Sequence, residues 1–110
     1  MKEYTPERSH IVWLHFSPQA GHEQTGFRPA LVMSPKSYNQ RTGLMLACPI
    51  TSKVKGYPFE VAVEGKRVQG VVLSDQIKCL DWKARKAKFA EKATESVHRE
   101  VQAKLLVLLQ

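Results

Sequence analysis

The fold is decided by residues 10–35, which read HIVWLHFSPQAGHEQTGFRPALVMSP. Residues 10–16 are mostly β-branched, aromatic and aliphatic at consecutive positions, which predicts a strand buried on both faces. Pro18 ends this strand, and the glycine-bounded segment 21–26 is expected to form an exposed loop. A second strand is predicted over 28–34, so the stretch provides two strands and a polar loop between them.

Further apolar runs bounded by turn residues predict four more strands, over residues 44–50, 59–63, 70–80 and 86–94. Alternation of apolar and polar residues in FEVAV predicts that the strand at 59–63 is half buried. The strand at 70–80 is expected to break near Asp75, and the lysines of the last strand are typical of a sheet edge that avoids pairing with other chains. A short helical turn is predicted between Pro35 and Gly43.

The C-terminal segment changes from a strand period to a helical one. Apolar residues at i, i+4, i+8 and i+11 form one stripe of an amphipathic helix, made by Val97, Val101, Leu105 and Leu108. Thr94 is expected to cap this helix, with Glu95 in its first turn. The 110 residues are therefore expected to form a single domain, mainly β (α+β), in which a small barrel-like sheet packs against one terminal helix.

The composition limits the class of protein and of partner. With 43% hydrophobic and 25% charged residues, it excludes a disordered chain. The formal net charge is +7, which favours a polyanionic partner: RNA, DNA, an acidic protein segment or an anionic membrane surface. Charge alone does not choose among these, and a generally basic solubilising surface is the alternative.

The cysteines and the missing motifs give further limits. Cys48 and Cys79 lie among apolar neighbours without CxxC spacing, and we expect both to be buried free thiols in a reducing compartment. The N-terminus lacks the apolar core of a signal peptide, and the aliphatic run 105–109 is too short to span a bilayer, so a cytoplasmic protein without a membrane partner is expected. No metal-binding or nucleotide-binding motif is found, so neither metal nor cofactor is expected.

Arg28 is the first candidate for chemistry. It precedes Pro29 at the start of a buried strand, which would fix its guanidinium for binding phosphate oxygens. Glu23, between His22 and Gln24, could accept a proton or orient a ribose 2′-OH close to that arginine. The alternatives are an ion pair between Arg28 and Glu23, or solvated loop residues without a function.

Residues 48–59, CPITSKVKGYPF, combine hydroxyl, basic and aromatic side chains, namely Thr51, Ser52, Lys53, Lys55, Tyr57 and Phe59. Hydroxyls donate to phosphate, lysines attract anions and aromatic rings stack on unpaired bases, which favours single-stranded nucleic acid. A polar turn with two core-edge aromatics is the alternative. Asp75 and Gln76 at the later strand break either read base edges or satisfy a turn. RNA cleavage by the adjacent 2′-OH would suit such a site, because the substrate supplies the nucleophile.

Several motifs, in this order and spacing, resemble the MazF/PemK (Kid) family of toxins: GHEQTGFRPALVMSP, YNQRTG, CPITSKVKGYPFEV, GVVLSDQIK and DWKAR. The resemblance covers residues 11–109. It implies an SH3-like β-barrel with a C-terminal helix, a homodimer, and a metal-independent, sequence-specific endoribonuclease that inhibits translation and growth. The substrate would be single-stranded mRNA, cut to 2′,3′-cyclic phosphate and 5′-OH ends. It also implies a cognate antitoxin whose acidic, flexible segment covers the RNA groove.

The resemblance implies roles for single residues. Arg28 and Thr51 match the residues that hold the scissile phosphate, with Arg28 as proton donor or electrostatic stabiliser. Glu23 is the candidate base of the MazF-like branch. In the Kid-like branch an aspartate matching Asp75 is the base, helped by an arginine two positions earlier; this chain has Leu73 there, which favours Glu23. The other implied RNA-binding residues are His22, Gln24, Phe16, Ser52, Lys53, Lys55, Phe59, Asp75, Gln76 and Lys78.

Two other functions are weighed against an endoribonuclease. The same fold serves CcdB-like toxins, which inhibit DNA gyrase by binding and perform no chemistry, but these lack the HEQ…R and PITS…KGYPF pairing of this chain. An RNA-binding module that has lost catalysis is the second alternative. The presence of Glu23, Arg28 and Thr51 argues against it.

Overall fold

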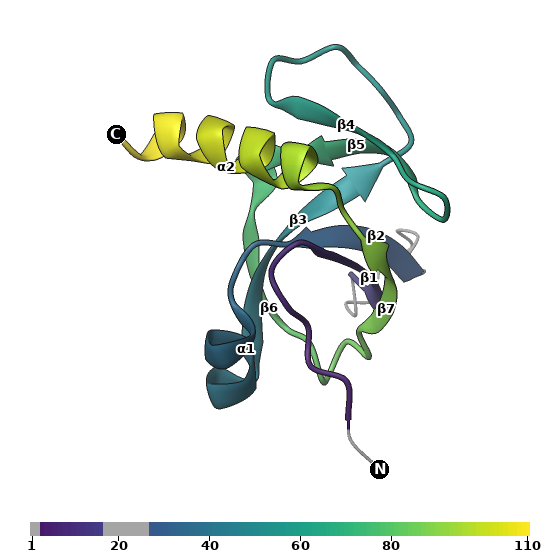
Figure 1. Ribbon diagram of the computed structural model, residues 1–110, viewed down its shortest axis with the longest axis vertical. Coiled ribbons are helices and arrows are strands. Elements are labelled where there is room, and N and C mark those ends of the chain that lie inside the picture. The colour runs from purple at the N-terminus through teal and green to yellow at the C-terminus, as the bar shows by residue number, and fades with distance from the viewer. Residues whose placement is uncertain (1–2, 17–26) are drawn as a thin grey trace.

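The computed structural model describes residues 3–16 and 27–110. In this part of the chain, seven strands form a curled half-barrel sheet, accompanied by two α-helices and one 3₁₀ turn (Figure 1). The elements are β1 (His10–His15), β2 (Phe27–Val32), α1 (Lys36–Thr42), β3 (Leu44–Thr51), β4 (Glu60–Glu64), β5 (Gln69–Leu73), η1 (Ser74–Gln76), β6 (Lys78–Asp81), β7 (Lys88–Lys92) and α2 (Glu95–Leu109). The predicted class, mainly β with a C-terminal helix, is confirmed.

β3 joins the two halves of the sheet. The strand order is β4-β5-β3-β2-β1-β7, with antiparallel neighbours throughout. Along its other edge, β3 pairs with β6 through residues 44–47 and with β5 through Ile50 and Thr51. The η1 turn allows this arrangement, because it ends β5 and redirects the chain into β6. The break predicted near Asp75 is confirmed, and it divides residues 70–80 between two strands.

The first strands are buried on both faces. Ile11 lies in one apolar cluster with Leu31 and with Val101 of α2. Val12, the next residue, lies in a second cluster with Met45 of β3. Because consecutive side chains of a strand point to opposite faces, a strand between two clusters must be apolar at successive positions. This confirms the prediction made from residues 10–16.

α2 covers the cluster that contains Val101. The hydroxyl of Thr94 accepts the backbone N–H of Val97 at 3.2 Å, so the predicted cap is confirmed. Val101 is fully buried, whereas Leu108, which belongs to the predicted stripe, is 47% exposed. The C-terminal end of α2 extends past the sheet (Figure 1), which explains the difference. Its last turn exposes Leu106, Val107, Leu108 and Leu109.

A buried asparagine ties α1 to the N-terminal segment. The amide of Asn39 donates to the carbonyl of Pro6 at 2.8 Å and to that of Ser34 at 3.1 Å. Its side-chain oxygen accepts the Ser34 hydroxyl at 2.6 Å, and the Trp82 indole donates to the Asn39 backbone carbonyl at 2.9 Å. Three segments far apart in sequence are therefore fixed to one short helix.

The prediction of two buried cysteines is half wrong. Cys48 is a fully buried free thiol, and burial raises its pKa to about 12. Cys79 is free but exposed. β6 is a short strand in which Leu80 faces the core, so Cys79 beside it faces solvent. The apolar residues next to Cys79 in the sequence did not indicate which face of β6 would pack against the core.

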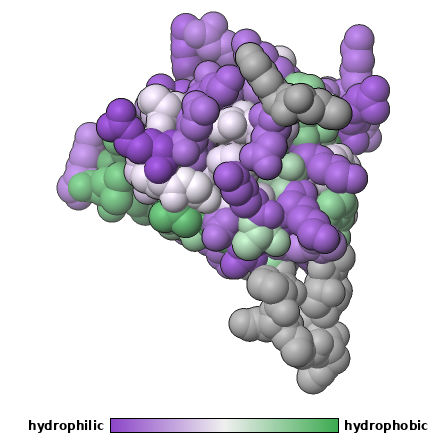
Figure 2. Space-filling view, turned by 90° about the horizontal axis from the view of Figure 1, so that it is seen from below, coloured by the Kyte–Doolittle hydropathy of each residue, from purple (hydrophilic) through white to green (hydrophobic). Residues whose placement is uncertain are grey.

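The face of the molecule shown in Figure 2 is mostly hydrophilic, with apolar residues in small patches. Charged residues make up 25% of the chain, which agrees with such a surface. Among the helices that the structure describes, none has the length and apolar character needed to cross a membrane.

Candidate functional site

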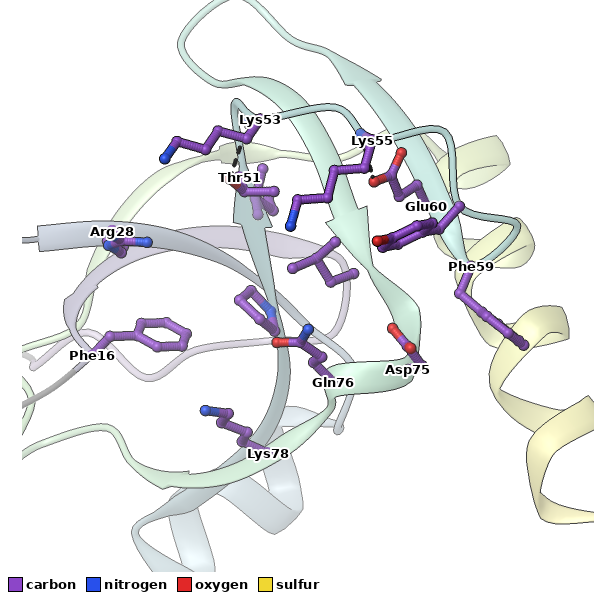
Figure 3. Close-up of a pocket in the computed structure, with 14 residues that line it drawn as sticks. Phe16, Arg28, Thr51, Lys53, Lys55, Phe59, Glu60, Asp75, Gln76 and Lys78 are labelled. Atoms are coloured by element: carbon purple, nitrogen blue, oxygen red, sulfur yellow. Dashed lines mark hydrogen bonds between the residues drawn. The ribbon is translucent and has the colours of Figure 1, made fainter.

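Two adjoining hollows lie where β2, β3 and β5 meet the loop after β3. The first hollow, of about 370 Å³, brings together nine of the predicted site residues (Figure 3). They are Phe16, Arg28, Thr51, Lys53, Lys55, Phe59, Asp75, Gln76 and Lys78. The second hollow, of about 450 Å³, contains Ser52 and shares Arg28, Thr51 and Lys53 with the first. The two hollows therefore form one groove, with Arg28 and Thr51 at their junction.

Arg28 is positioned by the pairing of the first two strands. It lies opposite Leu14 in the β1–β2 ladder, and the following Pro29 lies opposite Trp13. The guanidinium is directed into the groove (Figure 3). Within residues 3–16 and 27–110, no carboxylate lies within ion-pair distance of Arg28. None of the described carboxylates therefore neutralises its charge.

Thr51 is the last residue of β3. Its hydroxyl oxygen accepts the backbone N–H of Lys53 at 3.1 Å, so the hydroxyl proton is left to donate elsewhere. On the adjacent strand, Gly70 has φ of +148°, and a Cβ there would collide with the Thr51 carbonyl. Glycine therefore allows β5 to pack directly on the strand end that carries Thr51.

The loop after β3 is held by Glu60. Its two carboxylate oxygens accept the backbone N–H groups of Lys55 and Gly56, each at 3.0 Å. Figure 3 shows the bond to Lys55. This fixes a loop whose side chains are exposed, and it keeps Lys55 beside the first hollow, with Nζ 5.9 Å from the Tyr57 ring centroid. The alternation in FEVAV predicted only a half-buried strand and gave no indication of this role of Glu60. The sequence signal for this role is a carboxylate, Glu60, that follows Gly56 by four residues.

The opposite wall of the first hollow comes from Phe16, which follows β1, and from η1 and β6. Asp75 and Gln76 are exposed on η1, and Lys78 places Nζ 5.9 Å from the Phe16 ring centroid. The backbone N–H of Ser74 donates to the Phe59 carbonyl at 3.1 Å, which joins this wall to the loop side. Aromatic and basic side chains therefore face each other across the hollow.

The first hollow carries an excess of positive charge. Its lining includes four cations, Arg28, Lys53, Lys55 and Lys78, against two carboxylates, Glu60 and Asp75. Both oxygens of Glu60 are occupied by backbone N–H groups, which lowers their capacity to repel an anion. Exposed cations beside aromatic rings suit a single-stranded nucleic acid, because phosphates bind the cations while bases stack on the rings.

Three of the predicted residues, His22, Glu23 and Gln24, lie outside the described residues. The second hollow is also lined by residues that no sequence motif had indicated, namely Trp13, Arg67, Val68 and Gln69. Trp13 belongs to the strand predicted to be buried on both faces, but it is only partly buried. In the part of the chain that the structure describes, no group of three or more His, Cys, Asp and Glu residues is placed to hold a metal ion.

Comparisons with known proteins cover almost the whole chain. The model of the family described as "PemK-like, MazF-like toxin of type II toxin-antitoxin system" matches residues 7–109. The endoribonuclease toxin MazF of Escherichia coli K12 is 40% identical over 109 residues, 99% of this chain and 98% of the relative. The endoribonuclease PemK of Escherichia coli is 36% identical, over 94% of this chain and 81% of its own length.

Solved structures give the same result. A MazE-MazF crystal structure (Form-II) from Deinococcus radiodurans matches with a TM-score of 0.91 and 55% identity, over 97% of each chain. The crystal structure of MazF (Form-I) from the same organism matches with a TM-score of 0.88 and 55% identity, over 97% of this chain and 98% of that one.

Proposed function

The chain belongs to the PemK-like, MazF-like toxins of type II toxin–antitoxin systems, and from this premise we propose how its groove acts as an endoribonuclease. The substrate is single-stranded mRNA, and the reaction needs no metal ion. The observation that carries the proposal is the meeting of Arg28 and Thr51 at the junction of two hollows lined by further cations. That is the position at which a scissile phosphate would contact both.

The proposed reaction is an internal displacement at phosphorus. The ribose 2′-oxygen attacks the adjacent phosphorus, the bond from phosphorus to the 5′-oxygen breaks, and a 2′,3′-cyclic phosphate and a 5′-OH are formed. Arg28 stabilises the negative charge that grows on the phosphoryl oxygens or supplies the proton to the leaving 5′-oxygen, and Thr51 donates its hydroxyl proton to a phosphoryl oxygen. Glu23 takes the proton from the 2′-OH.

The remaining groove residues bind and orient the RNA strand in this proposal. Phe16 and Phe59 stack on bases, Lys53, Lys55 and Lys78 contact phosphates, and Ser52, Gln76 and Asp75 donate to or accept from bases and sugars, as do His22 and Gln24. Asp75 is the alternative base, but Leu73 stands where the Kid-like mechanism has its arginine, so we assign the base role to Glu23.

We further propose that the chain forms a homodimer and binds an acidic antitoxin in the cytoplasm. A structure that matches this chain at 55% identity is titled as a MazE-MazF complex, and an acidic segment would be attracted to the same cations as RNA. The free thiols Cys48 and Cys79 suit a reducing compartment. The curated relatives are named as endoribonucleases, so the alternative of a gyrase inhibitor receives no support.

Mapping of RNA 5′ ends in the presence of EDTA tests the reaction. Wild-type protein is expected to cut single-stranded RNA at a defined motif and to leave 5′-OH ends. Arg28→Ala should lower the rate by about a hundredfold or more, because a preorganised stabiliser of developing charge is lost. Arg99→Ala is the matched control, since this arginine is exposed on α2 and pairs with Glu95 away from the groove. Full activity of Arg28→Ala would contradict the assignment.

A further inference from the structure

The second hollow extends beyond the proposed reaction centre toward the turn between β4 and β5. On this side it is lined by Arg67, Val68 and Gln69. On the other side lie Arg28 and Thr51, so Arg67 is on the wall of a space that opens directly onto the reaction centre.

A carboxylate from another strand fixes this turn. Glu91 of β7 accepts three successive backbone N–H groups, from Lys66 at 3.1 Å, from Arg67 at 2.9 Å and from Val68 at 2.8 Å. Gly65 makes the approach possible, because a Cβ there would collide with the Glu91 carboxylate. The turn is therefore built around Glu91.

Local bonds complete the turn. The Gly65 N–H donates to the Val68 carbonyl at 3.0 Å, and the Gln69 amide donates to the Gly65 carbonyl at 3.1 Å. At the other end, Gly70 packs on the Thr51 carbonyl. The backbone that carries Arg67 is thus fixed both to Glu91 and to the strand end that carries Thr51.

The Arg67 guanidinium forms no ion pair with the described residues. Glu91 binds the turn through backbone N–H groups, and among the described residues no carboxylate lies within 4.0 Å of the Arg67 guanidinium. Arg67 is exposed at the edge of the hollow. A guanidinium on a fixed backbone, open to solvent and next to a phosphate site, is suited to bind a second phosphate.

We propose that Arg67 forms a second phosphate subsite, which binds the RNA backbone beside the scissile group, and that Glu91 is the positioning residue that fixes it. The inference rests on the proposed endoribonuclease function and deepens it. It also defines the path of the RNA strand, which runs from the first hollow across Arg28 and Thr51 to the β4–β5 turn.

The test measures binding of RNA oligonucleotides of increasing length. Each carries the mapped cleavage motif and a 2′-deoxy nucleotide at the position of the attacking hydroxyl, so that it binds without being cut. Nucleotides are added one at a time at either end, and Kd is measured by fluorescence anisotropy for wild-type protein, Arg67→Ala and Lys66→Ala. Lys66 is the matched control, because it has the same charge and lies in the same turn but lines a different hollow.

For wild-type protein and Lys66→Ala, one added phosphate at one end is expected to tighten binding by about tenfold. Arg67→Ala should lose this step, and the slope of log Kd against log salt concentration should fall by about 0.7. Glu91→Gln should lose part of the same step. The Arg67→Ala/Glu91→Gln double variant should lose no more than Arg67→Ala, because Glu91 acts through Arg67; additive losses would overturn the positioning role.

The two levels of the inference fail in different ways. A wild-type protein that neither binds nor cuts RNA would refute the proposed function and the subsite with it. Cleavage by wild-type protein, together with equal Kd values for Arg67→Ala and Lys66→Ala at every length, would refute the subsite alone. Loss of affinity for an acidic peptide, with RNA binding unchanged, would assign Arg67 to antitoxin contact and likewise overturn the proposal.

Discussion

At the scale of single residues, this groove depends on carboxylates that bind backbone rather than substrate. Glu60 fixes the loop of Lys55, and Glu91 fixes the turn of Arg67. Each lies on a strand and reaches a loop whose own residues are basic. Lys55 and Arg67 are therefore held through their backbone, and neither forms an ion pair with another described residue.

The pKa of Glu91 gives a test of its role in stability. Burial raises this pKa, but the N–H groups of Arg67, Val68 and Lys66 and the charge of Arg67 outweigh burial, so the pKa lies below its ordinary value of 4.5. The unfolded chain binds the proton more readily, so Glu91 contributes stability above about pH 4.5, and this is lost as the pH falls through the folded-state value.

Urea unfolding of wild-type protein and Glu91→Gln between pH 3 and pH 7 measures this contribution. Wild-type protein is expected to be the more stable at pH 7, and the difference should shrink toward pH 3. Glu64→Gln is the control, since Glu64 is an exposed carboxylate at the end of β4, next to the turn that Glu91 binds. A difference that is constant with pH would show that the charge of Glu91 has no part in holding the turn.

The two cysteines are expected to differ in reactivity. Cys79 is exposed, whereas Cys48 is fully buried with its thiol pKa raised to about 12. Because the thiolate is the reactive form, a maleimide at pH 7 should label Cys79 and leave Cys48 unmodified. Mass spectrometry of the native protein should show one added label, and the unfolded protein should show two. Rapid labelling of Cys48 in the native protein would contradict its burial.

At the scale of elements, the short helix α1 is stabilised by what its asparagine binds and not by its length. A helix of 7 residues is unstable alone, and Asn39 joins it to the N-terminal segment and to Ser34, which follows β2. The composition of KSYNQRT predicted a helical turn but not this network. Asparagine has a low helix propensity, so the sequence alone gives no sign that Asn39 stabilises α1. Its role becomes visible only when its partners in other segments are known.

Asn39→Ala is expected to destabilise the fold by about 2 kcal/mol or more, because buried polar groups of Ser34 and Pro6 lose their partners. The free energy of unfolding is measured in urea. Gln40→Ala is the matched control, since Gln40 is the exposed neighbour in the same helix. Equal stability of the two variants would contradict the role given to the network.

At the scale of the whole molecule, α2 covers one cluster of the sheet and then continues beyond it. Leu106 is 49% exposed and Leu109 is 77% exposed. An apolar surface of this kind at the end of an amphipathic helix is typical of an interface. It supports the proposal that two copies of the chain pair.

Replacement of Leu106 and Leu109 by Lys is expected to weaken that pairing, because apolar area buried between copies would be exchanged for charge. Light scattering coupled to gel filtration should give a dimer mass for the wild-type protein and a monomer mass for the variant. Gln102→Lys, on an exposed position of the same helix, serves as the control. A dimer that persists in the double variant would place the interface elsewhere.

The sequence by itself determined the elements of this protein and its candidate chemistry. Local periods predicted the strands and the terminal helix, and linked motifs pointed to Arg28 and Thr51, because such signals lie within short stretches of chain. The roles of both residues, and that of Glu23, stay predictions. The tertiary structure decided the exposure of Cys79, the two hollows, and the pairing of Glu91 with a turn 23 to 25 residues away. These depend on which strands become neighbours, and no local period carries that information.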